Sequence, residues 1–148
     1  MRQVVCGHCE SINRVADGRD PKTGKCGRCG ERLFDGKPAA VTAAGLEKRR
    51  RQSQGIALLV DVWAPWCGPC LAMAPQFASA AALLEPDVQL LKLDSEAEPA
   101  ASGAMGVRSI PTMILFRDGQ EAARTSGAMS ADQIVAWTRR SLGQTAAA

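Results

Sequence analysis

The sequence IALLVDVWAPWCGPC, at residues 56–70, carries the clearest structural signal in this 148-residue chain. Its first half, Ile56–Trp63, is a continuous aliphatic run bounded by Gly55 and Pro65, which predicts a fully buried β-strand. Apolar residues then recur every three or four positions, which predicts an amphipathic helix over 69–84. The two cysteines of the stretch therefore lie where a buried strand is followed by a helix.

That position predicts a reactive thiol at Cys67. Unpaired backbone N–H groups and the macrodipole at a helix N-terminus favour an anion, so they lower the pKa of a cysteine placed there. Cys70, one turn further into the helix, is expected to be more buried and to react second. Pro69 costs the helix little, because a first-turn N–H has no intrahelical partner anyway. The alternative, an inert buried pair, is disfavoured between a strand and a helix.

One carboxyl group lies inside the aliphatic strand. An ionised and unpaired carboxylate at Asp61 would cost several kcal/mol in such surroundings. Because Asp61 is on the strand that leads to Cys67, we favour a role as proton donor or acceptor for the cysteine pair. The alternative is a structural ion pair with Lys92.

The segments after residue 37 alternate between strand and helix patterns. In chain order they are a weak strand at 38–41, a helix at 42–54, the strand and helix described above, a strand at 88–94, a short helix at 95–104, a hairpin turning at 118–119 and a final helix at 130–142. The short and the final helix are expected to begin with capping boxes, Ser95 with Glu98 and Ser130 with Gln133. Early alternation predicts parallel strands and the hairpin adds antiparallel ones, so we expect an α/β fold with a mixed central sheet flanked by helices.

Residues 1–36 have a different character. They read as turns, with few apolar residues and no stretch of helical or alternating periodicity. Two more CxxC pairs lie there, and the spacing of Cys6, Cys9, Cys26 and Cys29 is typical of a four-cysteine structural zinc site. So small a segment would not fold alone without a metal ion or a disulfide. We therefore expect one structural Zn²⁺ per chain, in a closed site that leaves no position for a catalytic water.

Three alternatives for this segment remain open. The four cysteines can form two disulfides, although lasting disulfides are rare in the cytosol. His8 can replace one cysteine as a ligand, but it lies inside a turn between two better-placed thiolates. The paired CxxC turns also resemble nucleic-acid-binding zinc ribbons, which is the rival functional interpretation.

The net charge of +3 is too weak to indicate a nucleic-acid partner by itself. The basic excess lies in the first third of the chain, and it includes the run Lys48–Arg51. For so short a run we favour a solvated helix face over a nucleic-acid patch. No secretory signal or membrane-length apolar run is visible, so we expect a cytoplasmic protein without a membrane-bound segment. The weak net charge leads us to expect no nucleic-acid partner either.

The motif VDVWAPWCGPC, residues 60–70, resembles the active-site segment of the thioredoxin family, and IPT at 110–112 is similar to that family's second motif. The likeness continues in order over residues 38–143. With its four-cysteine segment the chain resembles the zinc-containing, two-domain bacterial type often called thioredoxin-2. The resemblance implies a thioredoxin fold at 37–148 preceded by a small zinc-ribbon-like module at 1–36. Val62 departs from the family, which commonly has an aromatic residue there, and the first strand is short.

The resemblance also implies roles for single residues. Cys67 would be the nucleophile, Cys70 the resolving thiol and Asp61 the acid or base that serves Cys70. A groove that receives an extended substrate would be bordered by Trp66, Ile110, Pro111, Gly127 and Ala128. The peptide bond before Pro111 would be cis.

These implications lead to a functional hypothesis. We expect a protein-disulfide reductase that exchanges its dithiol with disulfide-containing protein substrates and is reduced again by a thioredoxin reductase. No organic cofactor is needed, and a monomer is expected. The alternative is a redox-sensing zinc module that binds a partner and uses the WCGPC pair as a switch.

Overall fold

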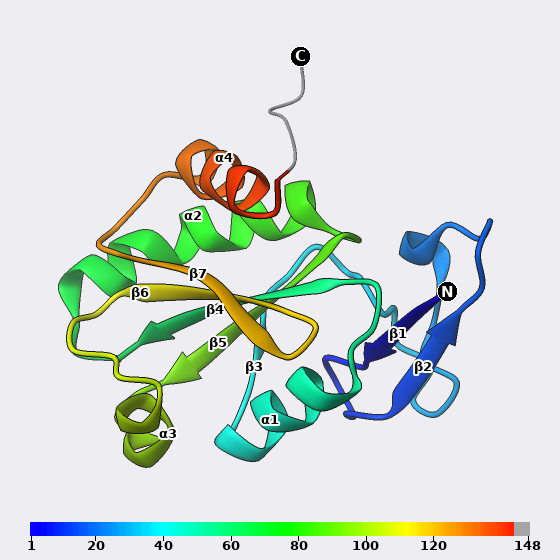
Figure 1. The fold of residues 1–148 in the computed structure, drawn as a ribbon, viewed down its shortest axis with the longest axis horizontal. Helices are drawn as coiled ribbons and strands as arrows, with labels where there is room; N and C mark the ends of the chain where they lie inside the picture. Colours follow the sequence, from blue (N-terminus) through cyan, green and yellow to red (C-terminus); the bar gives the residue numbers. More distant parts are fainter. Residues whose placement is uncertain (144–148) are drawn as a thin grey trace.

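The computed structural model describes residues 1–143, and its largest feature is one five-stranded mixed sheet (Figure 1). The strand order is β3-β5-β4-β6-β7. The strands β3 (Ala39–Ala40), β5 (Val88–Asp94) and β4 (Ala57–Trp63) pair in parallel. Strand β6 (Thr112–Arg117) pairs antiparallel with β4 on one side and with β7 (Gln120–Ser126) on the other. The predicted mixed sheet is therefore confirmed, with the strand that precedes the reactive cysteines at its centre.

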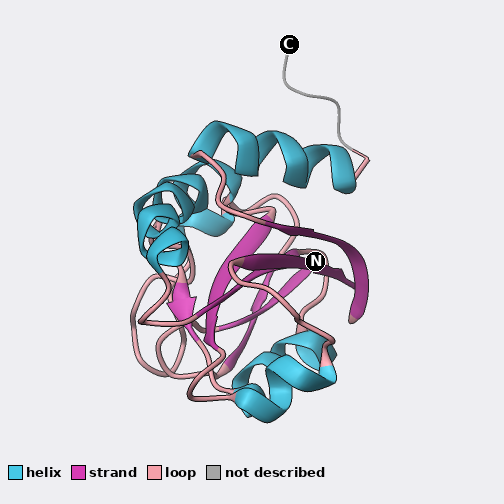
Figure 2. Cartoon of the chain, turned by 90° about the vertical axis from the view of Figure 1, so that its left-hand side faces the viewer, coloured by secondary structure: helices cyan, strands magenta, loops and turns pink. Residues whose placement is uncertain are grey.

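Helices cover both faces of this sheet, as the side view in Figure 2 shows. The helices are α1 (Ala43–Gln52), α2 (Gly68–Leu84), α3 (Pro99–Ala104) and α4 (Ala131–Ser141). One apolar cluster joins the sheet to α1 through Leu46 and to α3 through Ala101. A second cluster joins the opposite face to α2 through Phe77 and to α4 through Ile134. No helix among residues 1–143 is long and apolar enough to cross a membrane.

The central strand β4 has apolar side chains on both faces. Leu58 and Val60 belong to the cluster under α1, whereas Leu59 belongs to the cluster under α2. Burial on two sides explains why the sequence of this strand is continuously aliphatic rather than alternating. Because side chains alternate along a strand, Asp61 lies on the α2 side with Leu59.

The N-terminal segment forms a hairpin, so the expectation of turns alone was wrong. Strand β1 (Arg2–Val5) pairs antiparallel with β2 (Ile12–Val15), and a short 3₁₀ turn, η1, follows at Pro21–Thr23. These four-residue strands are too short to show a clear alternation in the sequence. Val4 and Phe34 pack in the same apolar cluster as the α1 side of the main sheet.

The short helix α3 does not begin as predicted. Its N-cap is Glu98, which makes no side-chain cap, so the Ser95–Glu98 capping box was wrong. Asp94 forms a turn instead, because its Oδ1 accepts from the backbone N–H groups of Glu96 at 2.9 Å and Ala97 at 3.3 Å. The Ser95 hydroxyl donates to the Trp63 carbonyl at 2.9 Å. By contrast, the capping box of α4, Ser130 with Gln133, is confirmed.

The basic run on α1 is only partly a solvated face. Arg51 is exposed, as expected, but the side chain of Arg49 is only 1% exposed and Arg50 is half-buried. The Arg50 guanidinium donates to the Gly119 carbonyl at 3.0 Å and lies 4.5 Å from the centre of the Phe116 ring. The expectation of a solvated face was therefore wrong for Arg49, whose partners are described below.

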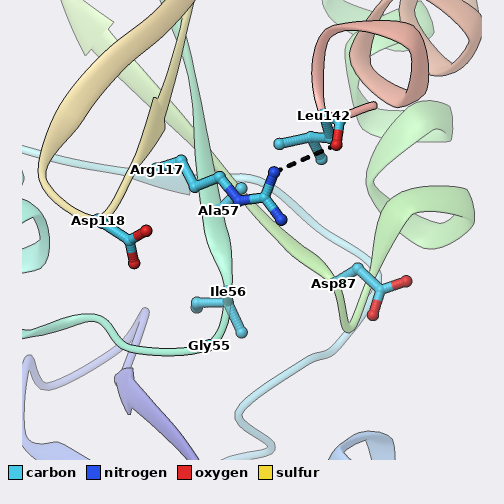
Figure 3. A pocket seen from close by; sticks show the side chains of 7 residues that line it. All are labelled: Gly55, Ile56, Ala57, Asp87, Arg117, Asp118 and Leu142. Carbon is cyan, nitrogen blue, oxygen red and sulfur yellow. Dashed lines mark hydrogen bonds between the residues drawn. The ribbon is translucent and has the colours of Figure 1, made fainter. Parts of the chain in front are cut away.

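A cleft of about 260 Å³ lies at the start of β4, at the end of the strand that is remote from Cys67 (Figure 3). Its lining residues are Gly55, Ile56, Ala57, Asp87, Arg117, Asp118 and Leu142. The Arg117 side chain donates to the Leu142 carbonyl at 3.2 Å and so holds the end of α4 against the sheet. This cleft makes no contribution to the site around the reactive cysteines.

Candidate redox site and four-cysteine centre

Cys67 and Cys70 form a disulfide bond at the N-terminus of α2. Their Cα atoms are 5.2 Å apart, within the range that a disulfide can bridge. Cys67 is the N-cap of the helix, and its Sγ accepts a hydrogen bond from the backbone N–H of Cys70 at 3.2 Å. A sulfur at this position is close to the partial positive charge of the helix N-terminus. This charge stabilises the thiolate when the disulfide is reduced.

The two cysteines lie just beneath the surface, beside an exposed tryptophan. Cys67 is 5% exposed and Cys70 is 1% exposed, so Cys70 is the more buried of the two, as predicted. Trp66, beside them, is 69% exposed. An exposed aromatic side chain next to a reactive bond is a common feature of surfaces that bind proteins.

The predicted groove residues from three separate segments lie near this disulfide. The Cys67 Sγ is 3.9 Å from the Ile110 carbonyl oxygen, and the Ile110–Pro111 peptide bond is cis. The Gly127 backbone N–H donates to the Pro111 carbonyl at 2.9 Å. Gly127 and its neighbour Ala128 are both exposed. The structure thus brings the loops 110–111 and 127–128 together beside Cys67.

A groove beside Trp66 extends this surface in a direction that the sequence did not indicate. It has a volume of about 350 Å³ and runs between Trp66, Ile110 and α3. The residues that were missed are Ser95, Pro99, Ser102, Gly103, Val107, Arg108 and Ser109. The position of Val107 to Ser109 directly before the IPT motif is the one sequence signal that could have indicated part of this groove.

Asp61 is a buried carboxyl without a direct partner. Its side chain is fully buried, and neither carboxylate oxygen has a hydrogen-bond partner. Burial raises its pKa to about 6, against the opposing effect of the positive charge of Lys92. Among residues 1–143 no ion pair joins Asp61 to Lys92. Asp61 can therefore take up and release a proton near neutral pH.

The four N-terminal cysteines form a compact cluster of thiols. Their Sγ atoms all lie within 4.8 Å of one another, with 3.7 Å between Cys6 and Cys29 and 3.5 Å between Cys9 and Cys26. A tetrahedral ion with bonds to sulfur of about 2.3 Å places its ligands about 3.8 Å apart. The cluster therefore fits a metal ion of this kind, and the separations are too long for the alternative of two disulfides.

Both CxxC turns direct backbone donors at sulfur. The N–H of His8 donates to the Cys6 Sγ at 3.3 Å, and the N–H of Arg28 donates to the Cys26 Sγ at 3.4 Å. Hydrogen bonds to Cys26, first from the Cys29 backbone and then from the Asn13 side chain, lower its pKa to about 6. Such donors stabilise thiolates, which are the form that binds metal ions.

His8 is not part of this cluster. Its Nε2 lies 3.2 Å from the Oδ2 of Asp35, and only cysteines belong to the metal-binding group found among the described residues. The alternative in which His8 replaces a cysteine ligand is therefore not supported.

The β1–β2 hairpin lies on the opposite side of the molecule from the start of α2, where the redox disulfide is found (Figure 1). The N-terminal hairpin contacts the chain just before β4, where the backbone of Gln3 pairs with that of Gln54. It also contacts the chain just before β5, where Arg2 binds Asp87 at 3.1 Å. Cys67, in contrast, follows the far end of β4. The hairpin therefore does not line the groove around Cys67.

Comparison with known proteins gives consistent results. The thioredoxin family model matches residues 40–140. Thioredoxin C-3 of Corynebacterium nephridii is 37% identical over 141 residues, which is 95% of this chain and 96% of that protein. Protein disulfide-isomerase A2 of Pongo abelii is 41% identical over 95 residues, which is 61% of this chain and 18% of that protein. The crystal structure of chloroplastic thioredoxin z superimposes with a TM-score of 0.66 and 28% identity, covering 72% of this chain and 96% of that one.

Proposed function

Because this chain belongs to the thioredoxin family, we propose that it reduces disulfide bonds in protein substrates through Cys67 and Cys70. It is a thiol–disulfide oxidoreductase, as its thioredoxin and protein disulfide-isomerase relatives indicate. The observation that carries the proposal is the position of Cys67 as N-cap of α2, where its sulfur accepts the Cys70 N–H. This position stabilises an attacking thiolate.

The reaction is a two-step exchange of thiols and disulfides. The Cys67 thiolate attacks one sulfur of a substrate disulfide, which forms a mixed disulfide and releases the other substrate sulfur as a thiolate that takes up a proton. The Cys70 thiol then loses its proton and attacks the Cys67 sulfur. The Cys67–Cys70 disulfide forms, the second substrate thiol leaves, and two electrons have passed from the protein to the substrate.

Asp61 is proposed to accept the proton of Cys70 in the second step. Its raised pKa of about 6 lies close to the working pH, where a general base is most effective. It lies on the α2 side of β4, two residues before Trp63, which packs against the apolar cluster of Cys67 and Cys70. The unpartnered carboxylate oxygens leave it able to bind a proton.

Substrate binding is proposed to use the surface around the disulfide. An extended substrate segment would pair with the backbone of Ile110, next to Pro111 and within reach of Cys67. Trp66, Gly127 and Ala128 would border it, and all three are exposed. The groove between Trp66 and α3 adds surface for the side chains that flank the substrate cysteine.

The four-cysteine centre is proposed to hold one structural zinc ion. Four thiolates at these separations match the tetrahedral geometry that Zn²⁺ adopts in closed sites, and Zn²⁺ would supply folding free energy rather than catalysis. We propose 1–36 as the zinc module and 37–148 as the thioredoxin domain, consistent with a family match that begins at residue 40. The relative with 37% identity matches nearly the whole chain, so its similarity extends into the zinc module.

Partners and compartment follow from the same chemistry. We propose disulfide-containing proteins as substrates, a thioredoxin reductase as electron donor, a monomeric state and no nucleic-acid partner. Four free thiols in the N-terminal module suit a reducing compartment such as the cytoplasm.

A reductase-coupled insulin assay tests the proposed function. The protein, NADPH and a thioredoxin reductase are mixed with insulin, and NADPH consumption is followed. We expect many turnovers per molecule for the wild type and none above background for Cys67→Ser. A single stoichiometric oxidation without turnover would support the alternative, a redox-sensing module, and contradict the reductase.

A further inference from the structure

The two CxxC turns of the four-cysteine centre have matching backbones but different residues at their ends. In the first turn the N–H of Glu10 donates to the Cys6 carbonyl at 3.1 Å, and in the second the N–H of Gly30 donates to the Cys26 carbonyl at 2.9 Å. Gly30 has a φ of 78° and Glu10 has a φ of 65°. Glycine adopts this left-handed region readily, but glutamate rarely does. The first turn therefore needs an additional contact to hold Glu10 in place.

Arg49 of α1 supplies that contact. Its side chain is 1% exposed, and its Nη1 donates to the Oε2 of Glu10 at 2.7 Å. Its Nη2 donates to the carbonyl of Cys6 at 3.1 Å. One guanidinium group thus binds both Cys6, the first residue of the turn, and Glu10, the residue directly after the turn. Arg49 lies 39 positions after Glu10 in the chain.

Gly45 makes room for this contact. It lies within α1, where glycine weakens a helix relative to alanine. A Cβ atom at Gly45 would lie 2.5 Å from the Oε2 of Glu10 and 3.3 Å from the Nη1 of Arg49. In the present conformation of Glu10, the absence of a side chain at this position leaves room for the carboxylate to reach the guanidinium.

The positive charge of the buried Arg49 is balanced by the carboxylate of Glu10. A buried arginine is costly unless it is paired, so loss of Glu10 would leave the guanidinium unpaired beside Cys6. Arg49 therefore acts on the first turn through its hydrogen bonds rather than through a net charge.

We propose that Arg49, together with Glu10 and Gly45, forms a latch by which helix α1 holds the first CxxC turn in its metal-binding conformation. Arg49 is a positioning residue and not a ligand. The neighbouring Leu46 packs in the apolar cluster shared by α1 and the main sheet, so the latch also links metal binding to the stability of the redox domain. This inference rests on the proposed metal site.

Zinc competition with a chromophoric chelator tests the latch in the full-length, reduced protein. We expect Arg49→Met to bind Zn²⁺ at least tenfold more weakly than the wild type, since loss of a contact that orients a metal ligand commonly weakens binding tenfold to a hundredfold. Arg49→Lys, which keeps the charge but not the two-pronged geometry, should be intermediate. The matched control is Arg51→Met, which makes the same chemical change at an exposed position of the same helix and should bind zinc like the wild type.

Two further variants separate backbone strain from the carboxylate contact. Glu10→Ala and Glu10→Gly both remove the partner of Arg49, but only glycine relieves the positive φ. Zinc binding should therefore be weaker in Glu10→Ala than in Glu10→Gly. Leu84→Ala, a cavity variant in the cluster on the other face of the sheet, should lower the free energy of unfolding without weakening zinc binding to the folded protein.

The outcomes distinguish the latch from the proposed function. Equal zinc affinity in Arg49→Met and Arg51→Met would overturn the latch and leave the metal site intact. If Arg49→Met does not fold, equal affinity in Arg49→Lys, Glu10→Ala and the wild type overturns the latch instead. A reduced wild type that binds no zinc at all would overturn both the metal site and the latch.

Discussion

Asp61 and Lys92 are direct neighbours in the parallel register of β4 and β5, yet no ion pair joins their side chains. The Lys92 ammonium lies 4.4 Å from the centre of the Trp63 ring, and both carboxylate oxygens of Asp61 lack a hydrogen-bond partner. A cation over an aromatic face is a favourable contact in its own right. Asp61 is therefore left as a buried acid whose proton affinity is set mainly by burial.

The first prediction concerns the pH dependence of stability. The pKa of Asp61 is about 6 in the folded state, against about 4 in the unfolded chain. The folded state therefore holds a proton that the unfolded state has lost, so the free energy of unfolding falls as the pH rises from about 4 through about 6. The full loss is about 3 kcal/mol. Asp61→Asn should remove this fall, with a gain in stability at pH 8 and little change at pH 4, measured by urea unfolding.

Asp61→Asn should also slow the second chemical step. Single-turnover reduction of a substrate should show slow resolution of the mixed disulfide, while the initial attack by Cys67 is less affected. A variant that is less stable at pH 8 and resolves as fast as the wild type would make Asp61 a structural partner of Lys92 and exclude the proton-transfer role.

A second prediction separates the two cysteines. Cys70→Ser should trap a mixed disulfide between Cys67 and the substrate, because no second thiol remains to attack it. Mass spectrometry should find one substrate chain attached per protein, released by dithiothreitol. Cys67→Ser is the matched control and should form no such adduct. Equal trapping by the two variants would show that the order of attack is not the one proposed.

A third prediction concerns removal of the metal. Chelation or Cys26→Ser should disorder residues 1–36, since metal binding provides folding free energy to that segment. The melting temperature of the whole chain should fall, because Val4 and Phe34 share an apolar cluster with Leu46 and Leu58. Insulin reduction at 25 °C should largely persist, because the hairpin contacts the chain just before β4 and β5, whereas Cys67 follows the far end of β4. Loss of all helical circular-dichroism signal at 25 °C on chelation would contradict this and make the metal essential to the entire fold.

A fourth prediction uses two glycines with positive φ. Gly106 has a φ of 68° with no atom near an added Cβ, whereas Gly119 has a φ of 77° and an added Cβ would lie 2.9 Å from the Arg50 carbonyl oxygen. Gly106→Ala should lose about 1 kcal/mol from backbone conformation alone, and Gly119→Ala about twice that or more. Denaturant unfolding compares the two. Equal losses would show that the Arg50 carbonyl moves away from the added Cβ atom at Gly119 with no further loss of stability.

The redox site could be predicted from the sequence because its geometry is local. A buried strand, two cysteines and a helix follow one another without a gap, so Cys67 had to lie at the N-terminus of α2. The Asp118-Gly119 turn is local in the same sense, with φ values of 53° and 77° as this turn requires. The spacing of the N-terminal cysteines likewise predicted their cluster.

The features that could not be predicted depend on distant contacts. The buried position of Arg49 depends on Glu10, which lies 39 residues earlier in the sequence, in the N-terminal segment. The strand β1 gains its backbone partner Gln54 from the chain just before β4. In the case of α3, Asp94 competed with Ser95 for the same backbone N–H groups, and the sequence pattern gave no reason to prefer it.

The three CxxC pairs are proposed to differ in role, with two pairs holding a metal ion and one pair exchanging electrons. This division of roles is tested by zinc content and free thiols, measured together on reduced and on oxidised protein under native conditions. We expect one zinc per chain in both states, with two freely reacting thiols in the reduced protein and none in the oxidised protein. Six freely reacting thiols and no zinc in the reduced protein would contradict it.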